Sequence, residues 1–127
     1  MLRELYLFVA RIRDFLNKNV NANQRVAERA KAYIETHYSN SSLTLDQVAG
    51  EMGISPNYFS ALFKQSTGSS FINYLTNVRI SHAKGLLKSG TSKTYEVAMR
   101  CGYENPTYFS TIFKRRTGVS PSEYRGD

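Results

Sequence analysis

The chain has 127 residues, of which 41% are hydrophobic and 21% are charged, a balance typical of one globular domain and not of a disordered chain. A single cysteine cannot form an internal disulfide, and no apolar run approaches the roughly 20 residues that a spanning helix needs, so disulfide-stabilised secreted domains and membrane-spanning proteins are excluded. The 17 Lys and Arg residues against 10 Asp and Glu leave a net charge of +7, which favours a polyanionic partner, nucleic acid above all.

Residues 1–24 are expected to form an amphipathic connector helix outside the main domain. Apolar residues recur there at alternating intervals of three and four, a heptad repeat over two heptads made by Leu2, Leu5, Val9, Ile12 and Leu16. Such a stripe needs a partner. Two interpretations stay open: the helix packs back on the following domain, or it is a homodimer seam or the tail of a connector from an upstream regulatory domain. Charged residues interrupt the stretch, which is therefore no signal peptide, and with the single cysteine we expect a cytoplasmic protein.

The remaining residues, 25–127, contain the residue types that begin and end short helices, and almost no pattern typical of a strand. N-capping residues and Pro open successive helices, and Gly ends them. The predicted boundaries are a capping box at Thr44–Gln47 with a stop at Gly53, Ser55-Pro56 with a stop at Gly68, a longer helix over about 70–88, a short helix that stops at Gly102, Asn105-Pro106 with a stop at Gly118, and a second capping box from Ser120 to Glu123. The predicted fold class is all-α, with about seven helices plus the connector helix.

The sequence contains an internal repeat with an offset of 49 to 50 residues. Residues 56–74 match residues 106–124 at ten of nineteen positions. Each copy consists of a short helix, a tight Gly turn and a longer Pro-capped helix, which is the helix-turn-helix pattern. The expected organisation is a first helix-turn-helix at about 43–68, a linker helix at about 70–88 and a second helix-turn-helix at about 92–118.

The second helix of each copy has an apolar face and, opposite to it, a small polar face that ends in a lysine. The outward positions are Asn57, Ser60, Ala61 and Lys64 in the first copy and Thr107, Ser110, Thr111 and Lys114 in the second. An ordinary solvated face is the alternative, but the same face with the same caps in two copies favours a DNA-reading surface. A linker of about 18 residues is a rod of about 27 Å, which suits two reading helices one DNA turn, roughly 34 Å, apart.

Residues 26–125 resemble the DNA-binding domain of the AraC/XylS family of bacterial transcription regulators. The resemblance is carried by LTLDQVAGEMGISPNYFSALFKQSTG from residue 43, VRISHAKGLL from residue 78 and VAMRCGYENPTYFSTIFKRRTGVSPSEYR from residue 97. It implies two lobes that bind adjacent major-groove segments of double-stranded promoter DNA, and transcription activation through contact with RNA polymerase. The segment from Asn40 to Gly68 resembles the response-regulator branch somewhat more than it resembles the free-standing small activators, and a free-standing protein stays an alternative.

The family's base-reading positions fall on the eight outward residues named above. Because none of the eight is an Arg that could pair with guanine, direct readout is expected to be modest and DNA shape to matter more. Asn57 is the exception, since Asn can pair with adenine. Tyr58 and Tyr108 flank the reading faces and are candidate phosphate contacts. Arg115 and Arg116 are further candidates, with the alternative that they complement their helix dipole.

We expect a non-enzymatic protein without cofactor, metal or membrane partner. Cys101 is expected to be a buried hydrophobe, and His37 and His82 stand far apart without paired ligands. Arg79 corresponds to the family's linker-helix Arg, for which a structural ion pair is favoured over DNA contact. Two rival functions stay open: a protein-interaction module, and a binder of RNA or single-stranded DNA, which the 13% aromatic content suggests.

Overall fold

The computed structural model describes residues 2–126, apart from the side chain of Asn19. Seven helices follow one another, and the described residues contain no strand: α1 (Leu2–His37), α2 (Leu45–Met52), α3 (Pro56–Thr67), α4 (Phe71–Ser89), α5 (Thr94–Arg100), α6 (Pro106–Thr117) and α7 (Pro121–Arg125). The predicted all-α class is confirmed. The connector is not a separate helix, however, because it continues without a break into the first helix of the predicted domain.

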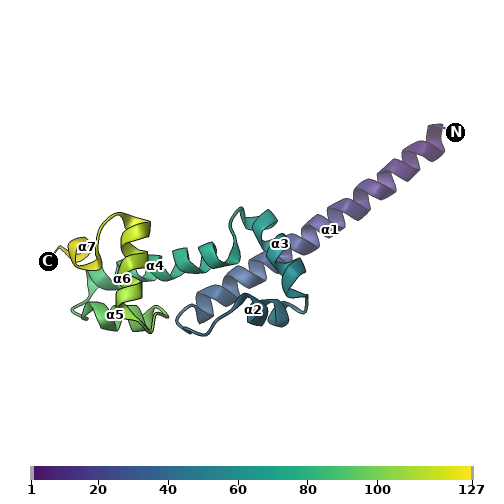
Figure 1. The fold of residues 1–127 in the computed structure, drawn as a ribbon. Helices are drawn as coiled ribbons and strands as arrows, with labels where there is room; N and C mark the ends of the chain where they lie inside the picture. Colours follow the sequence, from purple (N-terminus) through teal and green to yellow (C-terminus); the bar gives the residue numbers. More distant parts are fainter. Residues whose placement is uncertain (1, 127) are drawn as a thin grey trace.

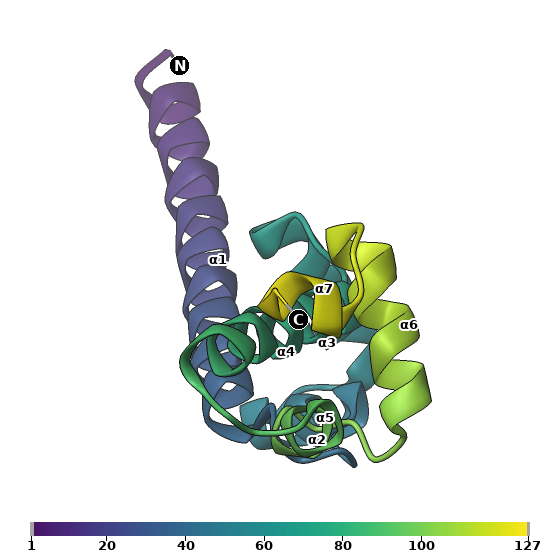
Figure 2. The same ribbon diagram turned by 90° about the vertical axis from the view of Figure 1, so that its left-hand side faces the viewer.

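The N-terminal half of α1 projects away from the rest of the molecule (Figures 1 and 2). The large apolar side chains of this segment are 44% to 84% exposed, with Ile12 the least exposed of them and Leu2 the most. The interpretation in which this segment packs back on the domain is therefore wrong. No helix among residues 2–126 is both long enough and apolar enough to cross a membrane.

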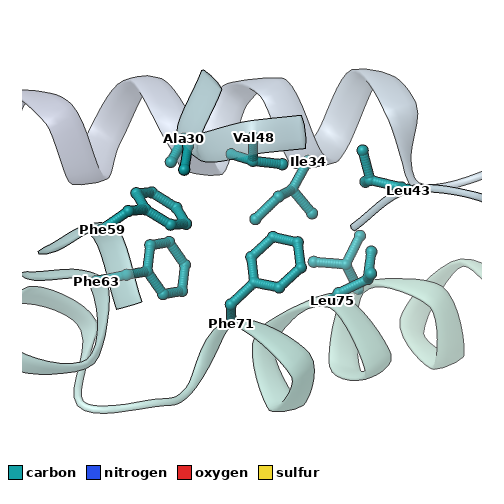
Figure 3. Close-up of a cluster of buried hydrophobic side chains, with 10 residues drawn as sticks. Ala30, Ile34, Leu43, Val48, Phe59, Phe63, Phe71 and Leu75 are labelled. Atoms are coloured by element: carbon teal, nitrogen blue, oxygen red, sulfur yellow. The ribbon is translucent and has the colours of Figure 1, made fainter. Parts of the chain in front are cut away.

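The rest of the chain forms two lobes with separate cores. Lobe 1 consists of the C-terminal half of α1, α2, α3 and the start of α4, and its core is shown in Figure 3. Lobe 2 consists of the rest of α4 with α5, α6 and α7. Helix α4 belongs to both, since Phe71, Leu75 and Val78 lie in the first core whereas Ile80 and Leu87 lie in the second. One helix thus carries both lobes (Figure 1).

The two helix capping boxes predicted from the sequence are formed almost as expected. Thr44 and Gln47 make both bonds of a capping box, each at 3.2 Å. Ser120 accepts a bond from the Glu123 N–H at 3.1 Å, and only this half of the second predicted box is formed in the described structure. Because such caps satisfy backbone groups that a helix end leaves unpaired, they define where each helix begins.

Arg79 joins the two lobes from the middle of α4. Its Nε donates to the Tyr38 carbonyl at 2.9 Å and its Nη2 to the Asn40 carbonyl at 2.8 Å, both in lobe 1. Its guanidinium also lies over the Tyr103 ring of lobe 2, 5.4 Å from the centroid. The structural role predicted for Arg79 is present, but the predicted ion pair is wrong: its partners are main-chain carbonyls and an aromatic ring.

One further hydrogen bond and one close backbone approach lie at the junction. The Ser41 hydroxyl donates to Glu104 Oε1 at 2.8 Å, although the two residues are 63 positions apart. Gly102 has φ +91°, and a Cβ there would lie 2.5 Å from the Tyr38 carbonyl oxygen. The two lobes are consequently packed against each other at a position that admits only glycine.

Candidate nucleic-acid interface

Helices α2 and α3, and again α5 and α6, form two helix-turn-helix units. The tight turn after α2 is made by Gly53 at φ +75° and the turn after α5 by Gly102 at φ +91°. Both second helices begin with Pro, and their N-caps Ser55 and Asn105 accept bonds from the backbone N–H three residues later. The same proline and the same type of N-cap bond therefore determine where both second helices begin.

The outward face of α3 is the face predicted from the sequence. Asn57, Ser60, Ala61 and Lys64 are all exposed. The opposite face of the same helix is buried, with Phe59 and Phe63 at 0% exposure in the lobe 1 core. Small side chains along the exposed face let the helix backbone approach a groove closely, and Lys64 near its end adds a positive charge.

The face of α6 repeats this arrangement with one difference. Thr107, Thr111 and Lys114 are exposed, whereas Ser110 is partly buried. The Thr111 hydroxyl is turned back to the Thr107 carbonyl at 3.1 Å. Because this hydroxyl already donates its proton to its own helix, the face of α6 offers fewer hydrogen-bond donors to base edges than the face of α3.

The two flanking tyrosines differ in what holds them. Tyr58 is 52% exposed, and its hydroxyl donates to Asn23 Oδ1 of α1 at 3.0 Å. Tyr108 is 56% exposed, and its ring lies 6.1 Å from that of Tyr103. No sequence motif indicated the contact between Tyr58 and Asn23, because the two residues are 35 positions apart and share no local pattern.

Arg115 and Arg116 are both exposed, but their contacts in the structure differ. Arg116 bonds to two side chains of α4, reaching Asn77 Oδ1 at 2.9 Å and Asn73 Oδ1 at 3.0 Å. Arg115 has no such bond among the described contacts. Arg116 therefore braces α6 against the linker helix, and Arg115 is the arginine of this pair that is available to a ligand.

A groove of about 430 Å³ lies between the lobes along α4. Its walls include Ser41 and Ser42 from lobe 1, Thr76 from α4 and Tyr108 from lobe 2. No motif could have indicated it, since its walls come from segments that meet only in the fold. It lies beside the N-terminal end of α6, next to the outward face of that helix.

The other candidate groups are structural. Cys101 is fully buried, and burial raises the pKa of its thiol to about 11, so the prediction of a buried hydrophobe is confirmed. His82 Nε2 lies 3.0 Å from Glu35 Oε2 and its ring stacks on Tyr38. Within residues 2–126, no group of three or more His, Cys, Asp or Glu side chains could hold a metal ion.

A family model described as "Helix-turn-helix domain" matches residues 48–127. Among curated proteins, an uncharacterised HTH-type transcriptional regulator of Escherichia coli K12, YijO, is 39% identical over 89% of this chain and 41% of its own length. The HTH-type transcriptional activator Btr of Bacillus subtilis is 42% identical over 61% of this chain and 15% of its own length. The chain spans 15% to 41% of the length of the first four such relatives.

Solved structures of similar proteins have the same fold. The C-terminal domain of AraT, a response regulator from Geobacillus stearothermophilus, has a TM-score of 0.78 at 46% identity, over 80% of this chain and 84% of that one. The DNA-binding domain of AdpA, solved in complex with a target DNA, has a TM-score of 0.75 at 28% identity, over 79% of this chain and 89% of that one. Each likeness extends over about four fifths of this chain.

Proposed function

The chain belongs to the AraC-type family of helix-turn-helix transcription regulators, and we propose that it binds double-stranded promoter DNA sequence-specifically through α3 and α6 in adjacent major-groove segments. The single observation that carries this proposal is a duplication: α3 and α6 have the same outward polar face, and the two lobes that contain them share helix α4. Helix α4 has 19 residues, or about 28 Å, which suits reading helices one DNA turn apart. The AdpA domain, similar over 79% of this chain, was solved with a target DNA.

We further propose that the bound protein activates transcription through contact with RNA polymerase. The support is the names of its relatives, which include a transcriptional activator of Bacillus subtilis and the lactose operon transcription activator of Staphylococcus xylosus. The proposal involves no catalytic step, in keeping with a family of transcription regulators.

Selection of bound sequences from a random duplex pool tests the proposal directly. We expect one motif with two half-sites, and footprinting should show two protected major-groove segments on one face of the duplex. Titrations with single-stranded DNA, RNA and duplex DNA at several salt concentrations separate the rival functions. Equal affinity for single strands and for the selected duplex would contradict the proposal.

We predict that Asn57→Ala and Lys64→Ala weaken binding in different ways. An amide that pairs with adenine in the major groove contributes about 1–3 kcal/mol of discrimination at one base position, so Asn57→Ala should relax preference there alone. Lys64→Ala should weaken binding to all sequences alike, because a lysine that contacts phosphate carries no base preference. Repeating the selection with each variant measures both effects. A motif left unchanged by Asn57→Ala would refute its role in base reading.

We predict that Arg115→Ala and Arg116→Ala separate a phosphate contact from a brace. Losing one phosphate contact flattens the slope of log affinity against log salt by about 0.9, which we expect for Arg115→Ala. Arg116→Ala removes the bonds to Asn73 and Asn77, so it should lower the melting temperature and change the slope less. Salt titrations and thermal unfolding of both variants measure the contrast. The assignment fails if Arg115→Ala leaves the salt slope unchanged and lowers the melting temperature instead, as loss of a helix-dipole contact would.

A further inference from the structure

The N-terminal half of α1 carries an exposed apolar surface, which we call the α1 stripe. It consists of Leu2, Leu5, Phe8, Val9, Ile12, Phe15 and Leu16. The stripe contains no charged residue, and the charged residues of the segment lie on the rest of the helix surface. A contiguous surface of large apolar side chains on a protein in water indicates an interface.

The α1 stripe lies on the same side of α1 as lobe 1. Eighteen residues make about five full turns of an α-helix, so residues eighteen apart point in one direction. Adding eighteen to Val9, Ile12 and Leu16 gives the three fully buried residues of α1, which are Ala27, Ala30 and Ile34. Adding eighteen to Phe8 and Phe15 gives Val26 and Tyr33, which pack against the same core. One continuous face of α1 is therefore covered by lobe 1 at its C-terminal half and uncovered at its N-terminal half.

From this geometry we propose that the α1 stripe binds the α1 stripe of a second copy of the chain, with the two helices antiparallel. The area is sufficient for a specific interface. Phe8 and Phe15 are 60% and 63% exposed, so with the five aliphatic side chains each copy offers on the order of 700 Å². Two copies would bury about 1,400 Å², within the roughly 1,200–2,000 Å² of stable specific complexes.

The position of lobe 1 determines the orientation. Packed helices lie only about 8–10 Å apart. In a parallel pair both copies would bring lobe 1 to the same end and to the facing sides, where that spacing leaves no room for two lobes. In an antiparallel pair each lobe lies beyond the end of the partner helix.

A hollow of about 330 Å³, lined by Val20, Asn23, Gln24, Gln65 and Ser66, lies where the stripe meets lobe 1. In the antiparallel pair the partner's first turn, residues 2–5, lies against residues 16–19, next to this hollow. This register sets Leu5 opposite the Leu16 of the second copy and Val9 opposite its Ile12. The pair carries two DNA-binding units at opposite ends, and its formation requires no DNA.

Sedimentation of the full chain over micromolar to millimolar concentrations tests the association. We expect a monomer–dimer equilibrium that Ile12→Glu with Leu16→Glu weakens by about 100-fold or more, because two carboxylates on each copy would be buried without partners. The matched control is Asn17→Glu with Asn21→Glu, which adds the same charge on exposed positions away from the stripe and should leave the dimer intact. Thermal unfolding of the lobes in each variant shows that they remain folded. A wild-type chain that stays monomeric throughout would overturn the proposal.

Disulfide cross-linking tests the orientation. A Leu5→Cys chain and a Leu16→Cys chain, one of them tagged for size, are mixed under mild oxidation. Cys101 takes no part, because it is fully buried and its raised pKa keeps it protonated. We expect the mixed disulfide to predominate. Predominant links between two Leu5→Cys chains, or between two Leu16→Cys chains, would show a parallel pair and overturn the antiparallel arrangement.

Discussion

Replacing Gly102 with Ala is expected to lower the free energy of unfolding by about 2–5 kcal/mol, the sum of a backbone penalty and a steric one. Gly102 has φ +91°, a conformation that costs an L-residue energy wherever it occurs. Its Cβ would also lie 2.5 Å from the Tyr38 carbonyl oxygen and 2.8 Å from Arg79 Nε. The substitution therefore strains its own turn and forces apart the atoms by which the two lobes meet.

Gly118 provides the matched control. It has φ +87°, but a Cβ there would meet nothing within 4 Å. Gly118→Ala should therefore cost only the backbone penalty, about 1–2 kcal/mol. Urea unfolding of both variants measures the difference, which is the steric contribution at the lobe junction. Equal losses in the two variants would mean that the junction relaxes freely around an added methyl group.

Moving the two half-sites of the selected DNA motif apart by about five base pairs, half a helical turn, is expected to lower specific affinity by about 100-fold or more. The lobes cannot follow the displaced half-site, because Arg79 and the bond from Ser41 to Glu104 hold them against each other. One reading helix would then face the outside of the duplex and lose its base contacts. Altering the DNA leaves the protein's own stability unchanged, so a loss of affinity reports geometry alone.

The corresponding change in the protein is a Gly-Gly insertion in α4 between Ser81 and His82. It rotates lobe 2 by about half a turn relative to lobe 1 and breaks the shared helix. Specific binding should fall much further than non-specific binding, which depends on charge alone. Quantitative binding to the original and the spaced motif checks both changes. Undiminished affinity for the spaced motif would show that the two lobes read DNA independently.

The sequence by itself determined the features that depend on neighbours a few residues apart. Caps such as Thr44 and Ser55, and the glycines that end α2, α3 and α6, are local chemistry, so the boundaries of these helices were predictable. The alternation of buried Phe59 with exposed Ser60 and Lys64 follows the helical period, and the repeat doubled that signal. Both outward faces were therefore predicted residue by residue, and the exposure of these residues agrees with that prediction apart from the partly buried Ser110, whereas their role in base reading stays a prediction.

Only the tertiary structure decided how these parts stand relative to one another. It joined the connector to the first helix of lobe 1, which put the α1 stripe and the lobe on one face. It also gave Arg79 two carbonyls and a ring in place of a carboxylate, and gave Arg116 two partners on α4. These contacts join residues 24 to 43 positions apart, in segments that share no sequence period. They form only once both cores have packed around α4, because packing, and no local preference of the chain, brings their atoms within bonding distance.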